Sequence, residues 1–247
     1  MSGNGDTETV SLAERTRWLL SRYWAEKLGV SPEAFERAGV AVGKTPRDDV
    51  DLFVRDEAMI VGAPSALVSD CDGAAGQLSG LDTDDAAAVR EWFETVVSPE
   101  RVLGPAFYGY ADPTTFDPVD DEARVLDESD ESAFETLRAA VPDEEWANGG
   151  PKFRPGETVG RFVDDLVAVA GYDVRDGLIA HVAVVTHPDH RSSGDGRAAV
   201  SLVTDRALDA GLLPQYRTLD AWPWSVALAE GLGYERFATS YRGVREP

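Results

Sequence analysis

The chain has 247 residues and carries 23 lysine and arginine residues against 45 aspartate and glutamate residues, which gives a formal net charge of −22. Nucleic acids and anionic membrane surfaces repel so acidic a chain, and we expect neither as a partner. This length allows one large domain or two modest domains with real cores.

Lysine is nearly absent, since only Lys27, Lys44 and Lys152 occur. Dense carboxylates with few lysines are typical of proteins adapted to a salt-rich cytoplasm, where salt screens the repulsion between them. An ordinary acidic protein is the alternative. The acidic residues are spread through the chain, which indicates a solvated surface rather than an interaction tail.

Cys71 is the single cysteine, so no intramolecular disulfide can form, and we expect a buried, inert thiol. No apolar run reaches the length that spans a membrane, and the first ten residues, MSGNGDTETV, lack the basic and apolar pattern of a signal peptide. We therefore expect a cytoplasmic protein.

In the first half of the chain the pattern predicts a helix over residues 12–28 that ends at Gly29, and a second helix that begins at Ser31-Pro32-Glu33. Further along we expect short strands at 51–54 and 58–61, a helix at 84–97 and an apolar segment at 101–110. The acidic stretch 117–130 is the predicted domain seam.

The second half is expected to alternate strands and helices. The predicted elements are a strand at 124–126, a helix at 132–140, a loop at 144–150, strands at 159–163, 166–174 and 178–186, a helix at 196–210, a strand at 215–219, a helix at 225–232 and a strand at 234–244. Tight turns join the three middle strands into an antiparallel meander. This order predicts an α+β fold with a mixed sheet.

The third meander strand leads directly into a short loop, Arg191-Ser192-Ser193-Gly194-Asp195-Gly196, and then into a helix. The first N–H groups of a helix have no intrahelical partner, so such a junction can hold an anionic group. The loop is too short for a Walker P-loop and does not follow the Gly-x-Gly-x-x-Gly pattern, so the sequence does not support a dinucleotide-binding fold.

Arg191, Gly194 and Gly196 fit the pattern Arg/Gln-x-x-Gly-x-Gly/Ala, and the longer string HVAVVTHPDHR before it is more specific. Together with AGLLPQYRTL and LAEGLGYERFA, this string resembles the GNAT (acetyl-CoA-dependent N-acetyltransferase) superfamily over about residues 120–244.

The resemblance implies a mixed, mostly antiparallel central sheet flanked by helices in the carboxyl-terminal half, preceded by a smaller α/β amino-terminal half. We accordingly predict an amino-terminal domain over residues 1–118 and an acyl-CoA-binding catalytic domain over 119–247. The first half lacks the phosphate motif, and one alternative is that it is a degenerate copy of the same fold.

The resemblance also implies transfer of an acetyl group from acetyl-CoA to a primary amine of a small molecule, by direct attack in a ternary complex and without a metal. The amides from Ser192 to Arg197 would hold the pyrophosphate, and the backbone of Val184 and Val185 would pair with the pantetheine arm. The full predicted cofactor-binding set is Val184, Val185, Arg191, Ser192, Ser193, Gly194, Asp195, Gly196, Arg197 and Ser225.

Several positions depart from the family pattern. Ser192 stands where relatives often carry glycine, and Asp195 would repel a pyrophosphate unless its side chain faces solvent, which we expect. Ala229 occupies the place of the tyrosine that many members use as proton donor, and Trp222 the place of a frequent asparagine. Tyr216, Ser225 and Tyr234 remain possible donors, although Tyr234 is expected in the core; solvent could also protonate the thiolate.

The predicted catalytic residues are His181, Glu145 and Tyr216, and the predicted substrate-binding residues are Trp146, Asn148 and Trp222. A histidine titrates near neutrality, so His181 suits a base, although it could instead be a packed strand residue. His187 and His190 are three residues apart, but no cysteine or acidic trio completes a metal site. Two other functions stay open, a non-catalytic acyl-CoA sensor and a protein-directed acetyltransferase, and the chain could form a homodimer.

Overall fold

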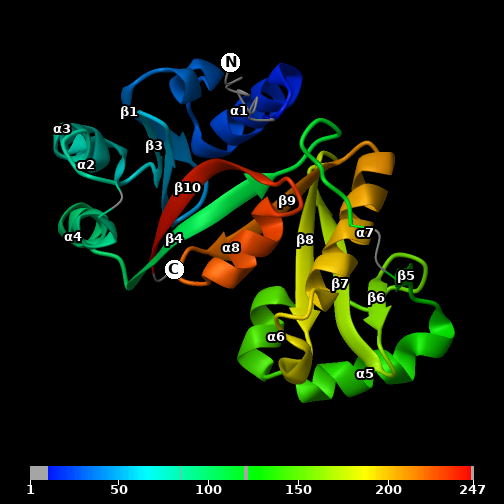
Figure 1. The fold of residues 1–247 in the computed structure, drawn as a ribbon. Coiled ribbons are helices and arrows are strands. Elements are labelled where there is room, and N and C mark those ends of the chain that lie inside the picture. Colours follow the sequence, from blue (N-terminus) through cyan, green and yellow to red (C-terminus); the bar gives the residue numbers. More distant parts are fainter. Residues whose placement is uncertain (1–10, 84, 120–121, 246–247) are drawn as a thin grey trace, which may run out of the picture. The chain divides into compact units, whose positions relative to one another are not determined.

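The computed structural model describes residues 11–83, 85–119 and 122–245 (Figure 1). The chain divides into two compact units. Unit 1 comprises Tyr110–Arg217 and Ala227–Glu235 together with the start of the chain, and unit 2 comprises Ala13–Gly109, Thr218–Val226 and Arg236–Pro247. Both units combine mostly antiparallel strands with flanking helices, as the α+β fold class predicted. The boundary at residue 118 stays a prediction.

Unit 2 has the strand order β1-β3-β2-β10-β4. The strands are β1 (Gly39–Thr45), β2 (Val50–Arg55), β3 (Ala58–Pro64), β4 (Arg101–Tyr110) and β10 (Glu235–Val244), and the helices are α1 (Glu14–Leu28), η1 (Pro32–Glu36), α2 (Val68–Gly73), α3 (Ala75–Leu78) and α4 (Ala86–Val96). β1 is parallel to β3, whereas β2 is antiparallel to both β3 and β10.

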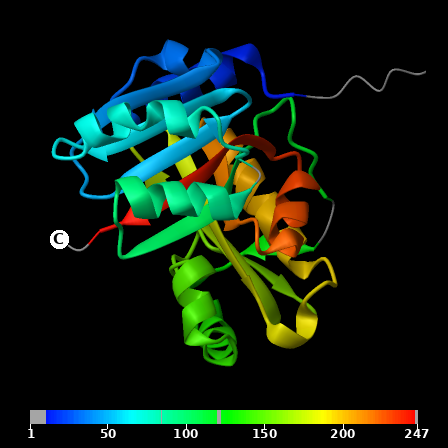
Figure 2. The same ribbon diagram turned by 90° about the vertical axis from the view of Figure 1, so that its left-hand side faces the viewer.

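Helices cover both faces of the strand layer in unit 2. Neighbouring residues of a strand point to opposite faces, so two adjacent apolar residues of β2 pack against different helices. Leu52 of β2 packs in a cluster with Val89 and Phe93 of α4, whereas the ring of Phe53 lies 4.6 Å from that of Trp24 in α1. Figure 2 shows α2, α3 and α4 in front of these strands. Cys71 belongs to the α4-side cluster, and burial raises its pKa to about 11, so the thiol is inert as expected.

Unit 1 has the strand order β9-β8-β7-β6-β5. The strands are β5 (Ala123–Val125), β6 (Val159–Phe162), β7 (Leu166–Arg175), β8 (Ile179–Thr186) and β9 (Leu213–Leu219), and the helical segments are η2 (Glu128–Asp130), α5 (Glu131–Ala140), α6 (Asp143–Gly149), η3 (Pro188–His190), α7 (Asp195–Asp209) and α8 (Pro223–Glu230). The end of β9 and the start of α8 are assigned to unit 2.

The predicted antiparallel meander is present as β6, β7 and β8. Asp176 and Gly177, with φ of 52° and 66°, form the tight turn between β7 and β8, and glycine adopts such angles at little cost. Val185 packs with α5 residues, whereas its neighbour Thr186 faces Gly196 of α7. The two helices therefore cover opposite faces of the meander.

Two local expectations were wrong, and strand β1 was not predicted. Residues 144–150, expected as a loop, lie mostly in helix α6, whose first turn contains the acidic Asp143, Glu144 and Glu145, and carboxylates stabilise a helix amino terminus. The helix expected at Ser31 is the 3₁₀ segment η1. Strand β1 was missed, because its glycines weaken the strand pattern. No helix within the described ranges is long and apolar enough to cross a membrane.

A carboxylate lies buried between two arginines in unit 2. Asp51 is 1% exposed, its Oδ2 lies 2.8 Å from Nη2 of Arg47, and its Oδ1 accepts a hydrogen bond of 2.7 Å from Nε of Arg242. The register of β2 and β10 places Arg242 directly opposite Asp51. Because a buried charge is costly without its partner, these three residues must be retained or lost together.

We expect Asp51→Ala to lower the free energy of unfolding by about 3 kcal/mol, because it leaves two arginines facing each other in a partly buried site. Asp143→Ala is the matched control: that carboxylate is 92% exposed in its pair with Arg138, and its loss should cost less than about 1 kcal/mol. Urea unfolding at constant salt measures both. Equal decreases in the free energy of unfolding for Asp51→Ala and Asp143→Ala would show that the ion pairs of Asp51 do not stabilise unit 2.

Candidate active site

The parallel strands β8 and β9 of unit 1 part after a short stretch of pairing. Three residue pairs match, Ile179 with Leu213, Ala180 with Pro214 and His181 with Gln215. β8 continues to Thr186 and remains paired with β7 along its other edge. Beyond His181, the edge of β8 that includes the predicted pantetheine partners Val184 and Val185 therefore has no ladder to β9, and this leaves backbone for an extended ligand.

His181 stands at the point where the two strands part. Its Nδ1 lies 2.9 Å from Oε1 of Gln215, and Nε2 of Gln215 donates to the hydroxyl of Tyr110. An amide oxygen only accepts, so Nδ1 of His181 carries the proton and donates it. The second ring nitrogen, Nε2, therefore keeps a free lone pair in the neutral ring. Sequence reasoning missed Gln215 and Tyr110, whose link to His181 depends on the strand register.

Burial first, and then the positive charges of Arg175 and Arg217, lower the pKa of His181 to about 4, against the opposing effects of Gln215 and Asp173. His181 is thus neutral at physiological pH. It is half-buried and shares its face of the sheet with Ala183 and Val185, the face that α5 and α6 cover.

An arginine–carboxylate pair lies next to His181. The register of β7 and β8 places Asp173 opposite His181, and Oδ1 of Asp173 accepts a 2.6 Å hydrogen bond from Nη2 of Arg154. This bond lowers the pKa of Asp173. Gly171 and Ala183 form the next pair along the strands. Along the face that carries His181, the polar pair of Asp173 and His181 is therefore followed by the small pair of Gly171 and Ala183.

The loop before α7 has the form of an anion site. Ser192 and Gly194 both have positive φ, 64° and 90°, which turns the chain sharply into a 15-residue helix. Arg191, Ser192, Ser193 and Gly194 are exposed. A Cβ on Gly196 would lie 2.6 Å from Oγ1 of Thr186, so only glycine lets the start of α7 approach the end of β8 this closely.

The expectation that Asp195 faces solvent was wrong. The residue is 6% exposed, its Oδ1 accepts a 3.3 Å hydrogen bond from Nε of Arg161, and its Oδ2 lies 3.6 Å from Nδ1 of His190. Arg161 is on β6, 34 residues away, and no local pattern shows this contact. The pairing with a cation holds the carboxylate at the helix start and compensates its charge.

The two arginines that flank the loop have partners within the protein. Nη2 of Arg191 donates to both carboxylate oxygens of Glu145 in α6, at 2.8 and 2.7 Å, and Nη2 of Arg197 donates to the carbonyl of Gly231. Nε of Arg197 is buried without a hydrogen-bond partner among the described groups. Glu145 is therefore engaged with the loop itself.

Helix α6 packs against the rest of unit 1 through Trp146. The Trp146 ring lies 5.4 Å from that of Phe134 and 5.0 Å from the Arg138 guanidinium, and Asn148 is exposed. A Cβ on Gly149 would come within 2.9 Å of the Val184 carbonyl. The carboxyl end of α6 thus lies directly on β8, beside the backbone that the sequence assigned to the pantetheine.

Tyr216 lies on the sheet face opposite His181, because its neighbour Gln215 points toward His181. It is 4% exposed, and its ring lies 5.7 Å from that of Tyr234. Burial raises the pKa of Tyr234, which hydrogen-bonds Thr204 and packs in the core as expected. Ala229, at the position of the family's proton-donating tyrosine, is fully buried.

The remaining predicted site residues belong to unit 2. Trp222 is 37% exposed and Ser225 is half-buried, and the backbone N–H of Ser225 donates to the carbonyl of Trp222. Their predicted roles stay predictions, as do those of the unit 1 residues above. Within the part of the chain that the structure describes, no group of three histidine, cysteine or acidic side chains could hold a metal ion.

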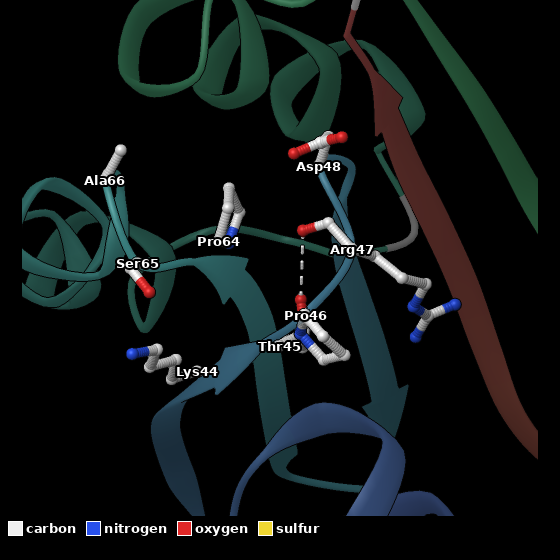
Figure 3. Close-up of a pocket in the computed structure, with 8 residues that line it drawn as sticks. All are labelled: Lys44, Thr45, Pro46, Arg47, Asp48, Pro64, Ser65 and Ala66. Atoms are coloured by element: carbon white, nitrogen blue, oxygen red, sulfur yellow. Dashed lines mark hydrogen bonds between the residues drawn. The ribbon is translucent and has the colours of Figure 1, made fainter. Parts of the chain in front are cut away.

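Unit 2 contains an open hollow where the loop after β1 crosses the end of β3 (Figure 3). Its lining is Lys44, Thr45, Pro46, Arg47, Asp48, Pro64, Ser65 and Ala66. Figure 3 shows the Arg47 side chain extending toward β10. This strand carries Arg242, the other arginine that pairs with Asp51. This lining includes no histidine or cysteine. We therefore place the candidate active site at the β8–β9 junction of unit 1.

No protein-family model matches this sequence, and no curated protein shows a significant match. Solved structures do match. An acetyltransferase from the GNAT family of Colwellia psychrerythraea aligns with 95% of this chain and 98% of its own, at a TM-score of 0.52 and 12% identity. The chain has the GNAT fold. The recognition made from the Arg191–Gly196 motif is thereby confirmed for the fold.

Two further structures with the GNAT fold align with smaller parts of the chain. A GCN5-related N-acetyltransferase from Kribbella flavida covers 67% of this chain and 65% of its own, at a TM-score of 0.45 and 22% identity. The acetyltransferase yncA from Salmonella typhimurium, described with its cofactor acetyl-CoA, covers 52% of this chain and 96% of its own, at a TM-score of 0.36 and 16% identity.

We expect the NMR titration midpoint of His181 near pH 4, well below the ordinary value of 6.5. The sign follows from linkage: the lowered pKa stabilises the fold fully above pH 6.5, and this contribution is lost as the pH falls from 6.5 to 4. Imidazole nitrogen shifts should report the proton on Nδ1 at neutral pH. A midpoint near 6.5, or the proton on Nε2, would contradict the described environment.

Proposed function

We propose that this protein is a GNAT-type N-acyltransferase that moves an acetyl group from acetyl-CoA to a primary amine of a small molecule by direct attack in a ternary complex. One observation carries the proposal. The Arg191–Gly196 loop, which is exposed from Arg191 to Gly194, leads into α7 at the end of the same strand, β8, whose edge becomes free next to His181. An anion site, a backbone edge and a neutral histidine thus lie along one strand.

The residues present fit an acyl-CoA. The backbone amides of the exposed residues Ser192 and Ser193, with the first turn of α7, suit a pyrophosphate, and the edge of β8 at Val184 suits the amides of pantetheine. Arg197 adds a cation on the first turn. Two carboxylates oppose the fit. Asp195 is compensated by Arg161, and Arg191 must leave its ion pair with Glu145 to contact phosphate.

When bound, acetyl-CoA supplies an acetyl thioester that reacts with an amine and releases a thiol. His181 is positioned to accept the proton of the attacking amine at Nε2, because Gln215 holds the proton on Nδ1. With a pKa near 4 it stays available at neutral pH but does not deprotonate a free ammonium ion. The amine must therefore arrive as its free base or lose its proton as the new bond forms.

Protonation of the departing thiolate does not need a tyrosine. The position of the family's proton donor is Ala229, and Tyr216 and Tyr234 are buried on the face away from His181. A thiolate with a conjugate pKa of roughly 8.5 is a fair leaving group, so solvent can protonate it after departure. We assign no general acid to the chain for this reason.

A second function remains, a non-catalytic acyl-CoA sensor. The observation that favours it is the ion pair of Arg191 with Glu145, because this predicted catalytic residue is engaged with the cofactor loop rather than with an acceptor. The two functions separate cleanly: an acyltransferase releases CoA thiol in the presence of a suitable amine, whereas a sensor binds acetyl-CoA without turnover. The single, buried Cys71 adds no background to a thiol-release assay.

We expect Gly196→Ala to weaken acetyl-CoA binding by roughly tenfold or more, because its Cβ would push α7 away from Thr186 and shift the loop amides. Gly76→Ala is the matched control, since a Cβ there meets nothing within 4 Å. Isothermal calorimetry gives the affinity, in dilute and concentrated salt, and thiol release over an amine panel gives the turnover.

The outcomes of this experiment are distinct. Binding to the wild type and to Gly76→Ala, weakened in Gly196→Ala, supports the acyl-CoA site. Turnover with any amine then favours the enzyme over the sensor. Absence of acetyl-CoA binding by the wild type at both salt concentrations overturns the proposal.

A further inference from the structure

Helix α1 of unit 2 presents an exposed tryptophan. Trp18 is 52% exposed, and the guanidinium of Arg22, one helical turn further on, lies 4.7 Å from the centre of its ring. The inner face of α1 holds Leu20, Trp24 and Leu28, which are buried in the core. An exposed tryptophan alone indicates no interface, so the argument depends on the charges that accompany it.

Trp18 belongs to a stripe of exposed residues on the outer face of α1, which consists of Arg15, Trp18, Arg22 and Glu26. At about 100° per residue, these positions cover roughly 80° of the helix surface. Within the described ranges, no ion pair engages the side chain of Arg15 or Glu26. The stripe therefore has a free cation at one end, a free carboxylate at the other and a cation–tryptophan pair between them.

This α1 stripe is complementary to itself when two copies of the helix run antiparallel. A two-fold axis that crosses the helix between positions 20 and 21 places Arg15 of one copy opposite Glu26 of the other, and Trp18 opposite Arg22. The symmetry generates each contact twice, which gives two ion pairs and two cation–π contacts. In a parallel pair, by contrast, Arg15 would face Arg15 and Glu26 would face Glu26.

The charge of the whole chain also favours a contact at α1. Two copies that each carry a net charge of −22 repel each other over most of their surface. Helix α1 interrupts this acidic surface, because its two carboxylates are outnumbered by four cations, Arg15, Arg17, Arg22 and Lys27. A contact here brings few carboxylates together, and salt screens the repulsion between the more distant ones.

We propose that the protein forms a homodimer in which the α1 stripes of two copies pack antiparallel, with Arg15 bound to Glu26 and Trp18 bound to Arg22 across the two-fold axis. The paired segment is about 16 Å long. A contact of this size is small for a protein interface, so we expect a weak dimer with a dissociation constant on the order of tens of micromolar. The inference does not rest on the proposed acyl transfer.

Sedimentation equilibrium of the full chain at constant moderate salt, over protein concentrations that bracket this value, measures the dissociation constant. Glu26→Arg turns both ion pairs into repulsions and should raise the dissociation constant by about tenfold or more. Trp18→Ala removes both cation–π contacts and the apolar area at the centre of the stripe, and we expect a loss of similar size.

Two variants outside the α1 stripe serve as matched controls. Glu94→Arg changes the net charge exactly as Glu26→Arg does, at an exposed position of α4, and Trp224→Ala removes a tryptophan of unit 2 that is 70% exposed. Both should leave the dissociation constant unchanged. Circular dichroism confirms that each variant is folded.

A mixing experiment tests the antiparallel register itself. Arg15→Glu and Glu26→Arg should each dimerise poorly alone, because like charges then meet at both ends of the helix pair. Mixed together, one copy has carboxylates at both positions and the other has arginines at both, so a heterodimer should form with about the wild-type affinity.

The outcomes either support or overturn the proposal. A wild type that stays monomeric over the whole concentration range overturns it and assigns the α1 stripe to a partner other than a second copy. A dimer that Glu26→Arg leaves intact, or single variants that fail to associate on mixing, overturns the antiparallel pairing of α1. Weakening by the stripe variants alone, with recovery on mixing, supports it.

Discussion

The separation of β8 from β9 after His181 and Gln215 is the constraint on which the candidate site depends. A longer ladder would satisfy the backbone of Val184 and Val185 within the protein and leave no edge for a ligand. His181 stands at the point of separation, and its burial lowers its pKa and keeps it neutral. The free backbone edge and the neutral histidine therefore lie next to each other on β8.

Charge compensation is the second theme of the structure. Asp195 lies at the start of the helix assigned to the pyrophosphate, where an unpaired carboxylate would oppose an anion, and Arg161 pairs with it from β6. In unit 2 the buried Asp51 has two arginines. In both places an arginine compensates a buried carboxylate whose unpaired charge would destabilise the fold or oppose a bound anion.

The sequence predicted elements with strong periodicity, including the meander of β6, β7 and β8, the helix α7 and the junction at Arg191–Gly196. It missed β1, whose glycines obscure the pattern, and it placed a loop where the acidic first turn begins α6. The partners Arg161, Gln215 and Tyr110 were missed as well. Each is distant in sequence from the residue it contacts, and strand register rather than local pattern brings them together.

The most direct test of this account is a crystal structure of the protein with bound CoA. We expect the pyrophosphate on the amides of Ser192 to Arg197, the pantetheine along the free edge of β8 at Val184, and Arg191 released from Glu145 to contact phosphate. A CoA molecule bound elsewhere, with the loop and the edge of β8 unengaged, would contradict the proposed function.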